Sequence, residues 1–124
     1  MTAPPPSLRA ALAAKQPRKA SLTTDLPRLA QQPAIYIVTS QRNGTLYVGV
    51  TSNLPKRIYE HRTATRPGFA ARYRCRILVY FELQADMRTA IAREKQLKGG
   101  SRARKLALIE SKNPTWRDLY PEIL

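Results

Sequence analysis

The alternation of apolar and polar residues predicts a β-hairpin near the middle of the chain. Residues 34–38 are β-branched and aromatic, which is typical of a strand. Asn43 and Gly44 follow as a pair that tolerates the positive φ angles of a tight turn. Residues 45–50 are the expected returning strand.

A helix and a third strand are expected after the hairpin. Ser52 or Asn53 can cap the helix, and Pro55 suits its first turn, where the missing N–H is harmless. This helix should run to about Arg62. The apolar run at residues 76–82 predicts the third strand.

Two further helices complete the pattern. Asp86 can cap a helix over residues 87–98, and the glycines at 99–100 provide its C-terminal stop. Ser101 opens the last helix, which the Asn-Pro pair at 113–114 ends. The order β-β-α-β-α-α predicts an α+β fold, in which helices flank a small three-stranded, at least partly antiparallel sheet.

Residues 1–33 differ in composition from the rest of the chain. They hold six of the ten prolines and no glycine or aromatic residue. Residues 7–14 could form a short helix, but the segment cannot bury enough apolar surface to offset its ordering entropy. We therefore predict a disordered, basic, Pro/Ala-rich arm at 1–33 and one folded domain at 34–124. The arm either contacts phosphates or is a solubilising tail, a misassigned start or a transit peptide.

The charge balance restricts the partner. Of 124 residues, 22 are Lys or Arg and 8 are Asp or Glu, so the formal net charge is +14. Such an excess favours a polyanionic partner, either nucleic acid or an anionic membrane surface. No predicted helix joins a basic face to a large exposed apolar face, so we expect no membrane partner. The single Cys75 excludes an internal disulfide and fits a reducing cytoplasm, at the nucleoid.

One carboxylate lies on the apolar side of the helix predicted over residues 87–98. The apolar stripe comprises Met87, Ala90, Ile91 and Leu97. Glu94 falls on the same stripe, where burial is costly unless a cation or hydrogen-bond donors meet it. Because His61 is the only histidine, a bound metal would depend on oxygen ligands, which favours Mg²⁺. An arginine partner, or a stripe that ends at solvent, explains Glu94 equally well.

Two further clusters carry candidate chemistry. Arg57 and His61 share one face of the first helix, where a guanidinium suits a phosphate and a neutral imidazole can accept a proton. Alone, such a histidine is more often a core residue. Tyr36 and Tyr47 flank the hairpin turn and share a face if the register allows it. Strand tyrosines commonly serve packing alone.

Basic residues are spread over the helices and loops, and many such charges are merely solvated. The candidate nucleic-acid-binding residues are Lys56, Arg62, Arg72, Arg74, Lys95, Lys98 and Arg102. Phe69 and Tyr73 lie among arginines, an arrangement typical of a nucleic-acid surface rather than a lipid one.

Four motifs occur in order: Ala-Ile-Tyr at 34–36, Tyr-Val-Gly at 47–49, the helix with Arg and His at 53–61, and Ala-Ile-Ala-Arg-Glu-Lys-Gln-Leu-Lys at 90–98. With this spacing they resemble the GIY-YIG nuclease family. The resemblance is strongest to its small stand-alone bacterial members, related to the N-terminal domain of the excision-repair nuclease subunit. Alanine replaces the first glycine of the name, and valine replaces the second isoleucine. The match spans about residues 34–119.

The resemblance implies hydrolysis of DNA phosphodiesters by an activated water, with one divalent cation, Mg²⁺ or Mn²⁺, and no small-molecule cofactor. Carried over by position, Glu94 binds the metal and Arg57 holds the scissile phosphate. Tyr36 or Tyr47 is, or belongs to, the general base, with His61 assisting.

Two positions depart from the family pattern. Leu106 stands where the family often has an asparagine, and Asn113 is a candidate replacement. Val50 stands where some relatives have a lysine, which Lys56 could replace.

We therefore predict a metal-dependent DNA endonuclease whose cleavage is structure-directed or weakly specific, acting in DNA repair. The alternative is a non-catalytic nucleic-acid-binding module on the same fold, and a structural basic protein is a third. The five retained site residues favour the enzyme. The choice between DNA and RNA, and the oligomeric state, stay open.

Overall fold

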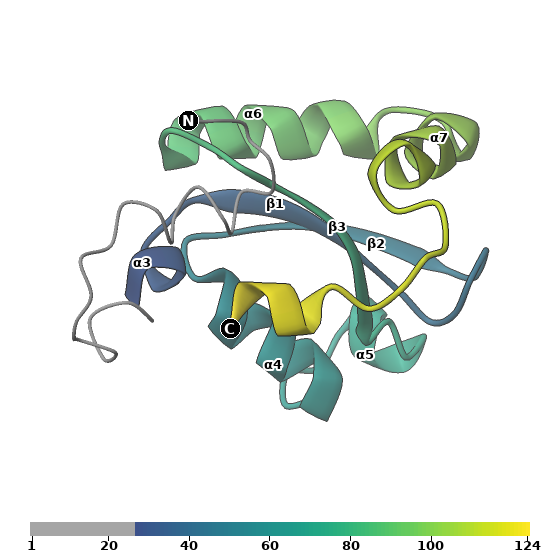
Figure 1. The fold of residues 1–124 in the computed structure, drawn as a ribbon, viewed down its shortest axis with the longest axis horizontal. Coiled ribbons are helices and arrows are strands. Elements are labelled where there is room, and N and C mark those ends of the chain that lie inside the picture. The colour runs from purple at the N-terminus through teal and green to yellow at the C-terminus, as the bar shows by residue number, and fades with distance from the viewer. Residues whose placement is uncertain (1–26) are drawn as a thin grey trace.

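The structure of this protein, a computed structural model, describes residues 27–124 (Figure 1). The predictions for residues 1–26, including the helix over 7–14, lie outside the described residues. Within the segment predicted as an arm, Pro27–Ala30 form a single helical turn, α3. Leu29 on this turn packs against the core beneath the sheet.

The sheet has three antiparallel strands in the order β2-β1-β3. These strands are β1 (Ala34–Thr39), β2 (Leu46–Thr51) and β3 (Ile77–Leu83). The hairpin between β1 and β2 turns at Asn43, whose φ of 59° is the positive value expected there. β1 is buried along its whole length, as expected of the central strand.

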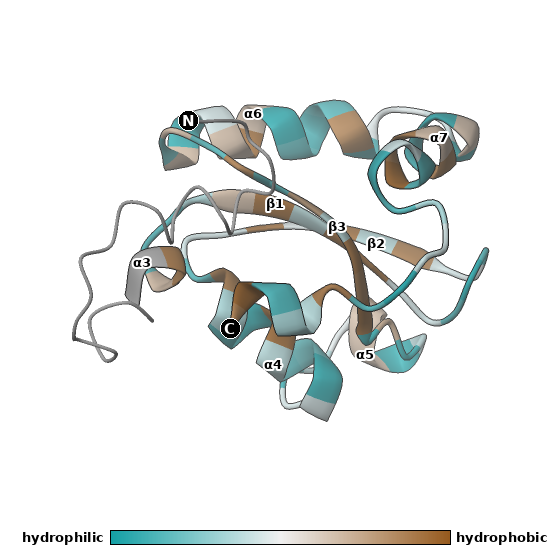
Figure 2. Cartoon of the chain, in the orientation of Figure 1, coloured by the Kyte–Doolittle hydropathy of each residue, from teal (hydrophilic) through white to brown (hydrophobic). Residues whose placement is uncertain are grey.

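Helices cover both faces of the sheet (Figure 1). On one face lie α4 (Leu54–Thr63), α5 (Phe69–Arg72) and the 3-10 turn η1 (Tyr120–Ile123). On the other lie α6 (Met87–Lys98) and α7 (Arg102–Lys112). Figure 2 shows hydrophobic residues along the strands, between helices that turn their hydrophilic residues outward. The predicted α+β architecture is therefore confirmed.

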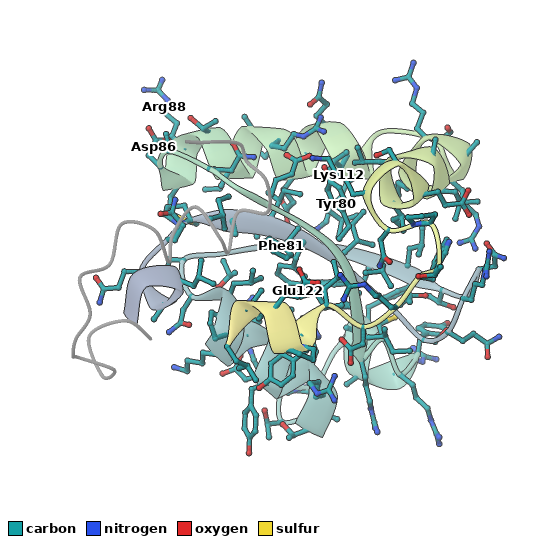
Figure 3. The ribbon with its side chains drawn as sticks, viewed as in Figure 1. Tyr80, Phe81, Asp86, Arg88, Lys112 and Glu122 are labelled. Atoms are coloured by element: carbon teal, nitrogen blue, oxygen red, sulfur yellow. The ribbon has the colours of Figure 1, made fainter. Side chains whose placement is uncertain are left out.

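Side-chain caps start the three long helices where the sequence predicted them. Asn53 accepts from the backbone N–H of Lys56, and Asp86 accepts from that of Thr89 at the start of α6 (Figure 3). Ser101 caps α7 in the same way. Each side-chain oxygen satisfies one orphan N–H of the first turn. The short α5 was not predicted, because four residues show no periodicity.

The C-terminal segment closes the face that carries α4. The N–H of Leu119 donates to the carbonyl of Leu78 on β3 at 2.8 Å, and Ile123 is almost fully buried. Within residues 27–124, none of the helices has the length and apolarity that crossing a bilayer requires.

Candidate active site

Gly49 leaves room for the ring of Tyr36 on the neighbouring strand. Tyr36 pairs with Gly49 of β2, and the Tyr36 ring lies directly over that glycine. A Cβ atom at position 49 would lie 2.3 Å from both Cζ and Oη of Tyr36, which is far inside van der Waals contact. The third residue of the Tyr-Val-Gly motif therefore has a steric role, which is to leave room for the phenol of Tyr36.

Both tyrosines and the histidine meet on the face that carries α4. Tyr36 Oη and His61 Nε2 share a hydrogen bond of 2.8 Å, in which the donor depends on the imidazole tautomer. The ring centroids of Tyr36 and Tyr47 are 6.4 Å apart, and those of Tyr47 and His61 are 5.6 Å apart. The register of β1 and β2 thus places both phenols on one face, the condition left open by the sequence.

A cavity of about 130 Å³ opens beside this cluster. Tyr47, Arg57 and His61 line it, together with Phe69 of α5. Tyr36 is fully buried behind it. Three of the five predicted site residues therefore face one cavity, and the fourth supports it from the core.

Two arginines share one carboxylate at the cavity wall. Glu60 Oε1 lies 3.2 Å from Arg57 Nε and 3.6 Å from Arg66 Nη1. A larger hollow of about 430 Å³ adjoins on the side of α3 and is lined by the same three residues and Lys56. Because two guanidinium groups oppose a single carboxylate, the wall is net positive and suited to a phosphate.

Removal from water governs the protonation states of Tyr36 and His61. Desolvation raises the pKa of the Tyr36 phenol far above its usual value, and the nearby Arg57 guanidinium opposes this only partly. Burial, followed by the positive charge of Arg57, lowers the pKa of His61 to about 4. At pH 7 Tyr36 is therefore a neutral phenol and His61 a neutral imidazole. Arg57 lowers the pKa of Tyr36, but burial raises it by more.

Glu94 approaches from the opposite face of the sheet. Its side chain is only 15% exposed and pairs with Lys98 Nζ at 3.1 Å. Lys98 Nζ in turn lies 5.7 Å from the centroid of the Tyr47 ring. α6 packs against the edge strand β2, and Lys98 reaches the Tyr47 ring around that edge. Glu94 does not line the cavity and is linked to the site through Lys98.

One member of the predicted apolar stripe of α6 is placed differently. Ala90 and Leu97 are buried, but Ile91 is 39% exposed and is not part of the core. Ile91 therefore lies on the flank of α6, and its assignment to the buried stripe was wrong. Glu94, one turn after Ala90, remains largely shielded from solvent.

The donor set around Glu94 suits a hard cation. Among residues 27–124 no group of three or more His, Cys, Asp or Glu side chains could hold a metal. A single carboxylate fits Mg²⁺, which keeps several waters and takes further oxygens from substrate phosphates. It does not fit a structural zinc, which requires four protein ligands.

The predicted nucleic-acid-binding residues divide into two groups. Arg62 forms an ion pair with Asp118, and its guanidinium lies 4.5 Å above the centroid of the Tyr120 ring. Arg102 donates to the carbonyls of Asn43 and Gly44 at 2.8 and 2.9 Å. These two arginines hold the tail and the hairpin turn. Both are nevertheless exposed, as are the other members of the set, Lys56, Arg72, Arg74, Lys95 and Lys98.

Asn113 is not brought to the site. Its side chain is buried, and its amide donates to the carbonyls of Val79 and Arg117 at 3.1 and 2.9 Å. Its Oδ1 accepts from the N–H of Arg117 at 3.1 Å. With its amide committed to the backbone at the end of α7, Asn113 does not replace the asparagine missing at Leu106.

Three residues of the site were not singled out in the sequence. Glu60 and Arg66 bracket Arg57 at the cavity wall, and Gly49 accommodates Tyr36. The sequence did carry a signal for Glu60, because a residue three positions after Arg57 on a helix lies beside it. Arg66 follows a left-handed turn at Ala64, which no sequence pattern specifies.

Comparison with known proteins agrees with this geometry. The family model for the GIY-YIG catalytic domain matches residues 32–107, so the chain belongs to the GIY-YIG family of nuclease domains, which act on DNA and generally use divalent metal ions. It is 34% identical over 87 residues to UPF0213 protein DP2720 of Desulfotalea psychrophila, covering 69% of this chain and 78% of that protein. It is also 35% identical over 78 residues to UPF0213 protein SH2523 of Staphylococcus haemolyticus, covering 63% and 94%. No solved structure matches the chain significantly.

Proposed function

We propose that this protein is a divalent-metal-dependent DNA endonuclease that hydrolyses phosphodiester bonds. The observation that carries the proposal is the convergence of Tyr47, Arg57 and His61 on one cavity, to which Glu94 is linked through its ion pair with Lys98. The match to a nuclease family supports it. Its place in DNA repair and at the nucleoid stays a prediction from the sequence.

The arginine pair positions the scissile phosphate. Arg57 presents a planar guanidinium beside Tyr47 and His61, and Arg66 adds a second positive charge at the wall. A phosphate in the cavity would accept hydrogen bonds from Arg57, in competition with Glu60. The adjoining hollow, with Lys56 at its rim, would take the neighbouring phosphate of the strand.

The neutral imidazole of His61 serves as the proton acceptor. In the tautomer whose Nε2–H donates to Tyr36 Oη, the Nδ1 lone pair is free for the proton of the attacking water. Tyr47, which lines the cavity, holds that water through its hydroxyl. Tyr36 is a positioning residue that fixes the imidazole ring. The negative charge of a bound phosphate would raise the pKa of His61 from about 4 and so strengthen the base.

Glu94 holds the divalent cation, Mg²⁺ or Mn²⁺. When bound, such a cation supplies the positive charge that offsets the charge developing on the leaving oxygen. When no metal is bound, the ammonium group of Lys98 balances the charge of the Glu94 carboxylate. Binding of a metal would therefore replace the Lys98 ammonium group at Glu94, and Lys98 would then be free to contact the phosphate backbone.

The test is cleavage by the purified full chain. Labelled single-stranded, duplex, flapped and branched DNA are incubated with Mg²⁺, Mn²⁺ or EDTA, using wild type, Glu94→Gln and Arg57→Ala. We expect metal-dependent cleavage by the wild type and a loss of at least about a hundredfold in both variants, of the size seen when a transition-state charge partner is removed. Glu94→Gln should bind DNA within about twofold of the wild type.

Glu122→Gln is the matched control. It neutralises a carboxylate that lies on η1, pairs with Arg117 and does not line the cavity. It should cut like the wild type. Failure of the wild type to cut any of these substrates with either metal overturns the proposal and leaves a binding module. Wild-type cleavage by Glu94→Gln overturns the role given to Glu94.

A further inference from the structure

Aromatic rings continue from the candidate site to the protein surface. The centroids of Tyr47 and Phe69 are 6.2 Å apart, with 26° between the ring planes, and those of Phe69 and Tyr73 are 4.6 Å apart. Tyr36, at the inner end of this row, is fully buried, whereas Phe69 and Tyr73 are 50% and 46% exposed. The row therefore begins in the core and ends as a pair of uncovered rings.

The backbone of α5 holds the outer pair in place. Ala70 is buried and anchors the turn, and the N–H of Cys75 donates to the Ala70 carbonyl at 2.8 Å. The left-handed φ of 136° at Gly68 sets the direction in which α5 leaves the preceding loop. With Ala70 inward, the neighbouring Phe69 faces the cavity mouth instead of the core.

Positive charge surrounds these rings. Arg66 lines the same cavity as Phe69, and its side chain is 59% exposed. The guanidinium of Arg72 lies 5.8 Å from the centroid of the Tyr73 ring, and Arg74 is exposed beyond it. Exposed aromatic rings among arginines, at the mouth of a phosphate-sized cavity, match the surfaces on which unpaired bases stack.

We propose that Phe69 and Tyr73 form a stacking platform for an unpaired nucleobase of the DNA strand whose phosphate occupies the cavity. The bases of a continuous duplex are stacked on one another and shielded, so a ring beside the backbone can reach a base only where it has left the stack. The substrate class is therefore DNA with unpaired nucleotides at the cleavage position, such as a single strand or a flap. This inference rests on the proposed function for the position of the phosphate.

Binding to cleavage-deficient protein tests the platform. In the full-length Glu94→Gln background, fluorescence anisotropy measures the Kd for a labelled single-stranded DNA 20-mer and for its duplex. Stacking of one base on an aromatic ring contributes about 1–3 kcal/mol, so Phe69→Ala should weaken single-strand binding about 5- to 150-fold. Tyr73→Ala should act in the same direction, and duplex binding should change less than about twofold.

Three control variants and one fluorescence readout separate stacking from folding and from general loss of apolar surface. Tyr59→Ala removes another exposed ring, 55% exposed on α4 and outside the row, and should leave both affinities unchanged. Phe69→Leu keeps an apolar side chain without a ring and should bind like Phe69→Ala, whereas Phe69→Trp should restore binding. A 2-aminopurine in the single strand should be quenched on binding, and the quenching should be lost in Phe69→Leu.

Equal losses on single strand and duplex, or no loss on either, overturn the platform. So does a dimer, seen by light scattering, that Phe69→Ala dissociates without changing single-strand affinity, because the patch would then belong to a second copy of the chain. Cleavage plays no part in this readout. A protein that cuts nothing but binds single strands through Phe69 keeps the platform and refutes the nuclease, and the reverse result refutes only the platform.

Discussion

Replacing Gly49 with alanine tests whether the site depends on the close approach of the two strands. The added methyl would lie 2.3 Å from Tyr36 Cζ and Oη and 2.8 Å from Cε2. Tyr36 is fully buried among core residues, so its ring cannot turn aside without displacing its neighbours. Relief of the clash must therefore move either β2 or the ring that holds His61.

The magnitude follows from two contributions. Overpacking a core costs about 1–3 kcal/mol. Losing the hydrogen bond between Tyr36 and His61 adds about 0.5–1.5 kcal/mol. We expect Gly49→Ala to lower the free energy of unfolding by about 2–4 kcal/mol, within the roughly 5–15 kcal/mol of an ordinary domain, so the variant still folds. For a domain of this size, that corresponds to a fall in Tm of roughly 8–30 °C.

Urea unfolding followed by the fluorescence of Trp116, the only tryptophan and a buried one, measures the loss. The decisive comparison is the same substitution in a Tyr36→Leu background, since leucine lacks all three of the clashing atoms. There the cost of Gly49→Ala should fall by about 1–2 kcal/mol, the coupling expected of residues in contact. An identical cost in both backgrounds would refute the steric reasoning.

Three other predictions follow from the described contacts. His61 acts as a base only when neutral, so kcat/KM for DNA cleavage should fall as the pH is lowered. The midpoint of the fall should lie near 4, the pKa of His61 in the free protein, and not near the usual value of about 6.5, and a pH profile of kcat/KM distinguishes the two values. Asn113→Ala should lower stability by about 2–4 kcal/mol, because three hydrogen bonds between its buried side chain and the backbone are lost, and leave DNA affinity intact. Arg102→Ala should lower stability by about 1 kcal/mol and leave the salt dependence of DNA binding unchanged. Lys95→Ala should instead reduce the slope of log affinity against log salt concentration by about one, as DNA titrations at several salt concentrations would reveal.

Local signals in the sequence predicted most of the fold. The hairpin turn and the helix caps depend on residues a few positions apart, so Asn43, Asn53 and Asp86 each marked an element correctly. The four-residue helix α5 carries no such signal. Its place at the cavity mouth depends on the buried Ala70, which is a tertiary contact.

Spacing and register predicted which side chains of the candidate site lie together, but not their protonation states. Arg57 and His61 share a helix face as their spacing requires, and the strand register brings Tyr36 and Tyr47 together. Which tyrosine is buried depends on packing across the sheet, and burial decides that Tyr36 keeps its proton. The structural roles of Arg62, Arg102 and Asn113 depend on partners far away in the sequence, which spacing cannot reveal.

The edge strand β2 has a consequence for biosynthesis. The side chains proposed to bind phosphate and accept a proton belong to the α4 layer, whereas Glu94, proposed to bind the metal, comes from α6, which is synthesised only after the sheet is complete. A nascent or partly unfolded chain with one helical layer undocked cannot hold all the groups needed for hydrolysis. Under the proposed function, cleavage is therefore confined to fully assembled molecules.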